Sequence, residues 1–284
     1  MTRKRLVALG VVVIAAGFAA DEPRKLKPGF NLFSKEQDIQ LGKEAAAQVE
    51  QQMTVVQDST LNSYIRRIGT KLASAPDADS KDFPYSFKVV ADPSVNAFAL
   101  PGGPTFVHTG LITAADNEAQ IAGVLAHEIS HVALRHGTNQ ASKANLVRLP
   151  AVLAGAVAGG SMLGNLAQLG IGLGANSVLL KFSRGAEPDA DLLGTRIMAS
   201  VGYNPIEMAR FFEKLEAEGG ARGPQFLSDH PNPGNRVQAV EQEIRYLPRR
   251  DYTEGDAREF ARVQQIVKAM PAPKARPRQQ SQQK

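Results

Sequence analysis

The chain has 284 residues, of which 43% are hydrophobic and 21% are charged, and it contains no cysteine. This length is typical of one or two domains, and the missing cysteines exclude disulfides, thiolate metal sites and a cysteine nucleophile. The formal net charge is +5, but seven basic residues stand at the two ends with no acidic residue beside them: Arg3, Lys4, Arg5, Lys274, Arg276, Arg278 and Lys284. Subtracting these seven charges leaves −2 for residues 6–270, which argues against a nucleic-acid partner.

Both ends of the chain are predicted to lie outside the folded domain. The basic start precedes fifteen uncharged residues, 6–20; this run is shorter than the ~20 residues of a membrane-spanning helix but suits the core of a signal peptide. We therefore expect an export signal over 1–20, with an uncleaved signal anchor through residues 6–20 as the alternative. Residues 271–284 are rich in Pro, Gln, Lys and Arg, which predicts a disordered basic tail.

The first half of the chain predicts two amphipathic helices and then three short strands. Apolar spacing indicates helices over 34–52 and 59–74, and strand-like runs cover 85–90, 97–100 and 105–109. A longer helix is predicted from about 114 to 136, with Gly137 directly after its end. Its expected buried stripe consists of Ile121, Leu125, Ile129 and Val132.

The second half begins with an ambiguous segment and ends in helices. Residues 149–180 carry no charge and contain seven glycines, so we expect a buried pair of small-residue helices or a mobile lid. A membrane-dipping hairpin is the alternative, although a spanning helix would be richer in large apolar residues. Further helices are predicted over 187–201, 204–218, 233–246 and 256–269. We expect a single catalytic domain over about 30–270.

The motif that indicates chemistry is His127-Glu128-Ile129-Ser130-His131. On a helix, His127 and His131 lie one turn apart on the same face, so both imidazoles reach one Zn²⁺ while Glu128 points to its open side. A metzincin would need Gly at position 134 and His at position 137, but the chain has Leu134 and Gly137 there. The third ligand must come from elsewhere, and residues 183–191 supply three candidate carboxylates: Glu187, Asp189 and Asp191.

Four motifs occur together in a characteristic order. They are residues 96–103 with 109–111, residues 127–131 with 135–137, residues 183–191, and His230-Pro231 with Arg236. In this order they resemble metallopeptidase family forty-eight, the gluzincin-type zinc endopeptidases that include HtpX, BepA and the CAAX prenyl endopeptidase. The resemblance covers about residues 30–250. It implies a predominantly helical α+β fold, a zincin-like catalytic domain with a small β-sheet beside the His-Glu-x-x-His helix.

The resemblance also implies roles for individual residues. Glu187 would be the third ligand of one Zn²⁺ per chain, and Asp191 would orient a ligand histidine, with Arg236 beside them. His230 would stabilise the oxyanion or occupy the open position of the zinc; a histidine that caps a turn is the alternative. The helix is expected to begin at Glu187 or to be kinked there because Pro188 follows, which leaves Asp189 and Asp191 as substitute ligands. His136 is interpreted as structural, and no role is assigned to His108.

These residues together predict a zinc metalloendopeptidase. Glu128 would be the general base, and an edge strand would bind an extended polypeptide through Asn96, Ala97, Phe98, Ala99 and Leu100. The family resemblance favours quality control of unfolded or misassembled envelope proteins in the bacterial periplasm. The expected partners of the protein are flexible polypeptides and either the membrane surface or the outer-membrane assembly machinery. No nucleic-acid partner is expected. The alternative is a chaperone or assembly factor with little proteolysis.

Overall fold

The computed structural model describes residues 24–146, 148–150, 152–153, 161–167, 179–218, 224–232 and 234–271. The predicted export signal, residues 272–284 of the predicted tail and most of the segment 149–180 lie outside these residues. Within them, no helix combines the length and the apolar character that crossing a membrane requires.

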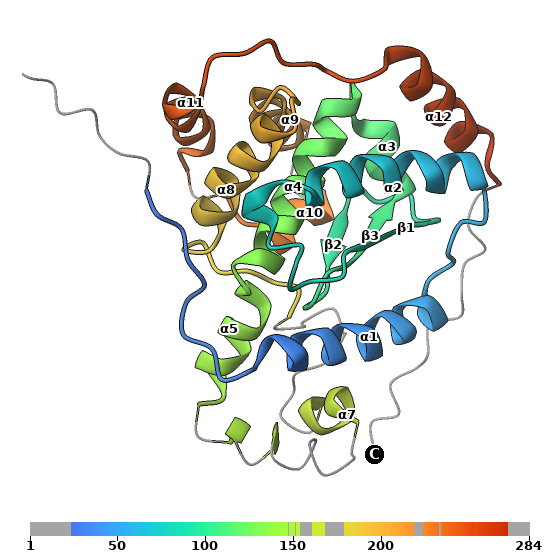
Figure 1. Cartoon of the computed structure of the whole chain (residues 1–284). Helices are drawn as coiled ribbons and strands as arrows, with labels where there is room; N and C mark the ends of the chain where they lie inside the picture. The colour runs from blue at the N-terminus through green and yellow to red at the C-terminus, as the bar shows by residue number, and fades with distance from the viewer. Residues whose placement is uncertain are drawn as a thin grey trace, which may run out of the picture.

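A small sheet lies between helices from the first half of the chain (Figure 1). Its order is β1 (Ser86–Val90), β3 (Pro104–His108) and β2 (Ala97–Ala99), with β1 parallel and β2 antiparallel to the central β3. Phe98 lies opposite Phe106 in this register. Within the described chain β2 pairs on one side only, as expected for an edge strand.

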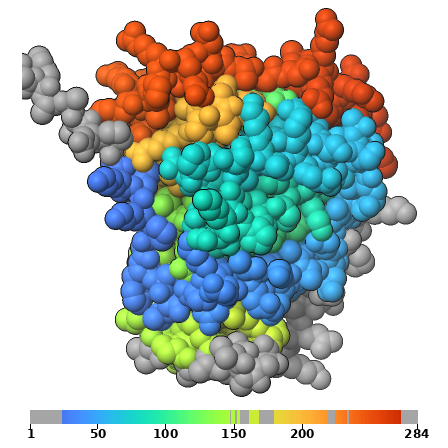
Figure 2. Space-filling view, viewed as in Figure 1, coloured from blue at the N-terminus to red at the C-terminus, as the bar shows by residue number. Residues whose placement is uncertain are grey.

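Helices cover the two faces of the sheet. α1 (Lys35–Gln52) begins with a capping box formed by Ser34 and Gln37, and it packs through Ala45 and Val49 against Phe106 on one face. α2 (Ser59–Ala73) is capped by Asp58 and shares the core on the opposite face. The short 3₁₀ helix Pro76–Ala78 follows α2, and α7 (Met162–Ala167) packs against α1. In Figure 2, α2 in cyan lies nearer the C-terminal helices in orange and red, and α1 in blue lies nearer the yellow-green segment that includes α7.

The helix predicted from about 114 to 136 corresponds to a single helix, α4 (Glu118–Ala133), which is shorter at both ends and lies between two short helices. α3 (Thr109–Ala114) is followed by a break, α4 begins after its N-cap Asn117, and α5 (His136–Ala144) follows. α4 ends because Arg135 adopts a left-handed conformation with φ 55°, which no α-helix can continue. The expectation that Gly137 follows the helix end is therefore wrong, since Gly137 lies in the first turn of α5.

α4 occupies the centre of the molecule (Figure 1). The predicted stripe of four apolar residues is buried, but so is every other residue of α4, because α2, α8, α9 and β2 all pack against it. The surrounding helices from the second half are α8 (Glu187–Ser200), α9 (Ile206–Glu218), α10 (Gln225–Asp229) and α11 (Arg236–Tyr246). α12 (Ala257–Ala269) packs on α2 and α3. The site residues of α4 are thus enclosed by protein.

Gly42 allows α1 to approach the turn that follows β2. A Cβ atom at this position would lie 1.8 Å from the carbonyl oxygen of Pro101, so Gly42→Ala forces the backbone of the turn to move. We expect a loss of about 2 kcal/mol in the free energy of unfolding, measured by urea denaturation. The energetic cost of relieving the overlap should exceed the ~1 kcal/mol by which Ala is favoured over Gly inside a helix. Lys43→Ala, at the exposed neighbouring position, should leave stability unchanged. A Gly42→Ala protein as stable as the wild type would contradict this packing.

Candidate metal centre

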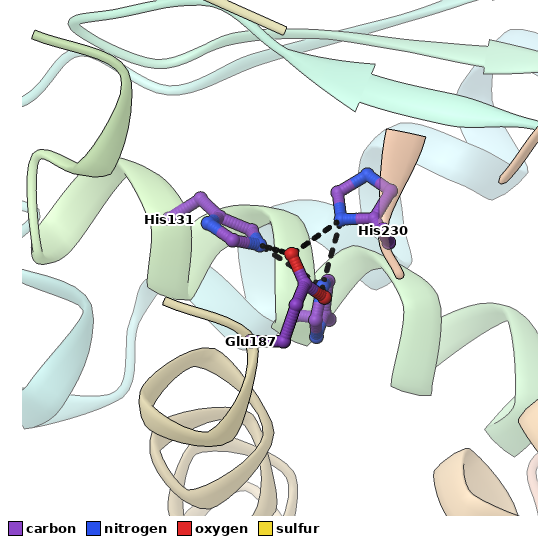
Figure 3. Close-up of side chains that lie close together, drawn as sticks. His131, Glu187 and His230 are labelled. Carbon is purple, nitrogen blue, oxygen red and sulfur yellow. Dashed lines mark hydrogen bonds and ion pairs between the residues drawn. The ribbon is translucent and has the colours of Figure 1, made fainter. Parts of the chain in front are cut away.

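Four buried side chains from three parts of the chain converge on one point. His127 and His131 come from α4, Glu187 is the first residue of α8, and His230 directly follows α10. One ligand atom from each lies within 4.8 Å of every other. Figure 3 shows His131, Glu187 and His230 pointing toward one another. The structure therefore brings together the two predicted histidines, the predicted carboxylate and the histidine placed near the metal by resemblance.

The spacing of the ligand atoms fits a tetrahedral ion. His127 Nε2 lies 3.0 Å from both His131 Nε2 and His230 Nδ1. Glu187 Oε2 lies 3.2 Å from His127 Nε2, and Glu187 Oε1 lies 3.6 Å from His131 Nε2 and 3.4 Å from His230 Nδ1. Zinc–nitrogen bonds of about 2.0–2.1 Å give a tetrahedron with edges of roughly 3.3 Å, and imidazole with carboxylate is a donor set that suits zinc.

The buried polar atoms also favour a cation. Glu187 Oε1 is buried and has no hydrogen-bond partner, and a bound cation would satisfy it. Burial alone would raise the pKa of Glu187, but the adjacent His230 and His127 outweigh burial and hold this pKa well below its usual range. The carboxylate is thus ionised, the state in which it binds a metal.

A second layer of contacts orients the ligands. Asp191 Oδ1 lies 2.9 Å from Nδ1 of His127. Arg236 donates from Nε to Asp191 Oδ2 at 2.6 Å and from Nη2 to Glu187 Oε2 at 2.9 Å, and it lies over the ring of Phe212. Asp191 and Arg236 therefore stand where the resemblance places them, beside the ligands.

Pro188 does not kink α8, because the helix begins at the residue before it. α8 begins at Glu187, so Pro188 lies in the first turn, where its missing N–H is not needed. The substitute ligands do not reach the cluster in this arrangement: Asp189 pairs with Arg24 at the surface, and Asp191 faces the outer nitrogen of His127.

Glu128 lies between the edge strand and His230. Its Oε2 accepts a hydrogen bond from the backbone N–H of Ala99 at 3.0 Å, and its Oε1 lies 3.2 Å from His230 Nε2. Burial raises the pKa of this carboxyl to about 7, although His230 and the Ala99 N–H oppose the shift. A carboxyl of this pKa exchanges a proton near neutral pH, as a general base must.

The predicted substrate segment borders the cluster. Asn96 O accepts from His108 N and Leu100 N donates to Pro104 O, so the alternation of an antiparallel pair directs the main-chain groups of Ala97 and Ala99 away from β3. Phe98 stacks on Phe106.

The edge strand is also joined to the helix before His230. Asn96 Nδ2 donates to Asp229 Oδ2 at 3.1 Å, and Phe226 N donates to Val95 O at 3.2 Å. The residues around the edge strand are thus joined to the segment that carries His230.

Two neighbours of His131 were missed as site residues. His136, interpreted as structural, places Nδ1 2.8 Å from Nδ1 of His131, and burial lowers the pKa of His136 to about 4. Phe182 stacks on the His131 ring with centroids 3.7 Å apart. His108 lies away from the cluster, where its Nδ1 contacts Ser94 Oγ. His136 belongs to the sequence motif 135–137, which was the available signal. Its contact with His131 could not be inferred from helical spacing, because α4 ends between the two residues.

Residues 59–244 match the model of peptidase family M48. The chain is similar to the beta-barrel assembly-enhancing protease of Escherichia coli (strain K12), with 33% identity over 211 residues, 71% of this chain and 42% of that protein. Metalloprotease LoiP of the same strain is 31% identical over 251 residues, 84% of this chain and 95% of that protein. The mitochondrial metalloendopeptidase OMA1 of Schizosaccharomyces pombe is 30% identical over 181 residues, 63% of this chain and 52% of that protein. The alignment thus spans about two fifths of the length of the assembly-enhancing protease.

The contact between Asp191 and His127 should strengthen metal binding. Asp191→Asn removes the anionic acceptor, so we expect zinc affinity to fall by about 10–100-fold, measured by competition with a chromophoric chelator. Asp189→Asn, two residues earlier on α8, is the matched control and should leave zinc affinity unchanged. Equal affinities for the two variants would contradict the role of Asp191; a loss confined to Asp189→Asn would assign the third ligand to Asp189.

Proposed function

The chain belongs to peptidase family M48, and from that premise we propose that it is a zinc-dependent metalloendopeptidase acting on unfolded or misassembled cell-envelope proteins. The observation that carries the proposal is the convergence of His127, His131 and Glu187 on one point with Glu128 beside it. We propose one zinc ion per chain, held by these three residues.

The reaction follows from the roles of these groups. When bound, zinc supplies a Lewis acid that activates water and polarises a carbonyl. Glu128, as general base, takes a proton from the attacking water and passes it to the nitrogen of the leaving amine. The position of Glu128 between the cluster and Ala99 supports a binding mode in which the peptide bond to be cleaved lies next to the edge strand.

The edge strand supports an extended substrate. The outward N–H and carbonyl of Ala97 and the outward carbonyl of Ala99 can pair with a polypeptide that adds to β2, a mode of binding that uses backbone hydrogen bonds. The Ala99 N–H is not part of this set, because it donates to Glu128 Oε2. In the proposal Asn96, Phe98 and Leu100 complete this substrate segment. A chain must be unfolded or flexible to bind in this way, which favours misassembled proteins as substrates.

We propose that His230 keeps the resting site closed. Its Nδ1 stands at the fourth corner of the cluster, 3.0 Å from His127 Nε2, where a water or a substrate oxygen would have to bind. Its Nε2 also lies close to Glu128. In this proposal His230 must leave before a substrate is cleaved.

The proposed setting is the bacterial periplasm. The pattern of residues 1–20 supports export, with cleavage of the signal or retention as an anchor, and the domain would extend over about 30–270 with a basic tail. The envelope role is supported by similarity to a beta-barrel assembly-enhancing protease. The membrane surface and the outer-membrane assembly machinery are the proposed partners, and the charge of residues 6–270 argues against nucleic acid.

A second function is favoured by one observation. Because His230 fills the fourth corner, the same edge strand could hold a polypeptide with little turnover, as a chaperone or assembly factor would. Proteolysis by the wild type, compared with a variant of the general base, distinguishes the two functions.

The general base can be tested without removing the metal. Glu128→Gln should retain zinc but lower the cleavage of unfolded casein by about 10²–10⁴-fold, because the amide cannot accept the proton. Glu118→Gln, a buried carboxylate at the other end of α4, is the control: it should lower stability and keep cleavage. Zinc-dependent cleavage by Glu128→Gln at the wild-type rate would refute the mechanism.

The gating role of His230 predicts a gain of activity. His230→Ala should retain zinc through three ligands and raise kcat/KM on unfolded casein by about tenfold, the factor for a closure free energy of ~1.4 kcal/mol. A fall comparable to that of Glu128→Gln would instead assign His230 to the chemical step.

A further inference from the structure

The two histidine ligands of α4 differ in what their outer ring nitrogens contact. Nδ1 of His127 faces the carboxylate of Asp191 at 2.9 Å, and that carboxylate is held by Arg236. Nδ1 of His131 faces another imidazole, that of His136, at 2.8 Å. The proposed metal would therefore have one ligand supported by an anion and one supported by a histidine.

We propose that His136 is a positioning residue for the metal ligand His131: it accepts the Nδ1 proton of His131 and thereby fixes the tautomer and the orientation that present Nε2 to the metal. The inference rests on the proposed zinc site and assigns to it a residue outside the four that converge.

The arrangement of protons follows from the geometry. His131 Nε2 points into the cluster, and a nitrogen that binds a metal carries no proton. In a neutral imidazole the proton then sits on Nδ1, which donates. The nitrogen at 2.8 Å, Nδ1 of His136, must be the acceptor, so His136 carries its own proton on Nε2.

The turn between α4 and α5 makes this contact possible. On a continuous helix, positions five residues apart point about 140° away from each other, because each residue turns the chain by about 100°. The left-handed conformation of Arg135 ends α4 and brings His136 back toward His131. Arg135 is itself anchored, since it donates to Asp38 Oδ2 and to Phe33 O, each at 2.6 Å.

The ring of His131 is also held on its face. Phe182 stacks on it with an interplanar angle of 16°, which restricts tilting but leaves rotation within the ring plane. A hydrogen bond to Nδ1 opposes that rotation. His136 therefore supplies the directional contact that the apolar neighbour cannot supply.

The chemistry of the partner predicts an order of affinities. A carboxylate that accepts from a ligand histidine raises the basicity of the ligand, and outer partners of this kind typically change metal affinity by about 10–100-fold. His136 is a neutral acceptor and supports His131 more weakly than Asp191 supports His127. An anionic acceptor at position 136 should consequently tighten metal binding.

Three substitutions of the full chain test the proposal through zinc affinity, measured with a chromophoric chelator. His136→Ala should lower affinity by about 10–100-fold. His136→Asn should restore most of it, because its Oδ1 is as many bonds from Cβ as the imidazole Nδ1. His136→Asp should bind zinc at least as tightly as the wild type. The visible absorption of the Co²⁺-substituted proteins should change with His136→Ala and return with His136→Asn.

The control is His108→Asn, which removes another buried histidine, one that lies away from the cluster. It should lower the thermal stability of the metal-free protein and leave zinc affinity unchanged. Wild-type affinity in His136→Ala, or equal losses in His136→Ala and His136→Asn, would overturn the positioning role. A wild-type chain that binds no zinc would instead refute the proposed function, so the two failures are distinguishable.

Discussion

The arrangement of the centre depends on one buried guanidinium. The carboxylates of Glu187 and Asp191 on α8 are buried. Burying a charged carboxylate away from water costs a large free energy unless the charge is paired. Arg236 bonds to both, which its planar fork allows from a single position. The same contact joins α11 to α8, so the interaction that stabilises the two charges also assembles the C-terminal helices around α4. Glu187 is then directed at the histidines, and Asp191 at the outer nitrogen of one of them.

Close packing of small residues sets the distances within this assembly. A Cβ at Gly123 would lie 2.7 Å from Cβ of Met208 on α9, and one at Gly194 would lie 3.3 Å from the backbone nitrogen of His127. α8 thus approaches α4 directly at its first ligand, and α9 approaches it one turn earlier, at Gly123. Metal ligands must be positioned to within a few tenths of an ångström. The helix spacing that these glycines allow therefore contributes to the geometry of the metal centre, as the polar contacts do.

The metal-binding side chains were more predictable from the sequence than the path of the backbone around them. The spacing of His127 and His131 specifies a shared helix face, and the first-turn position of Glu187 is consistent with the proline that follows it. The short helix α3 and the turn at Arg135 were not predicted, because six residues are too few to show a helical period and a left-handed arginine is uncommon. The contact between His136 and His131 was not predicted either, because it depends on the change of chain direction at Arg135. The short α10 was not predicted either, although it determines where His230 lies.

The hydrogen bonds from the 95–96 segment to α10 have a consequence for selectivity. Val95 and Asn96 hold α10, the helix that His230 directly follows, while the next three residues form β2. In the proposed mechanism a polypeptide that lies along β2 meets the gate and the scissile position on one continuous surface. A short peptide gains few backbone contacts with which to offset displacement of His230, whereas a long unstructured chain gains many. A natively folded protein offers no free strand and leaves the gate in place. Selection would then depend on the conformation and the length of the substrate rather than on its sequence, which allows a protease to remain active among folded neighbours without degrading them.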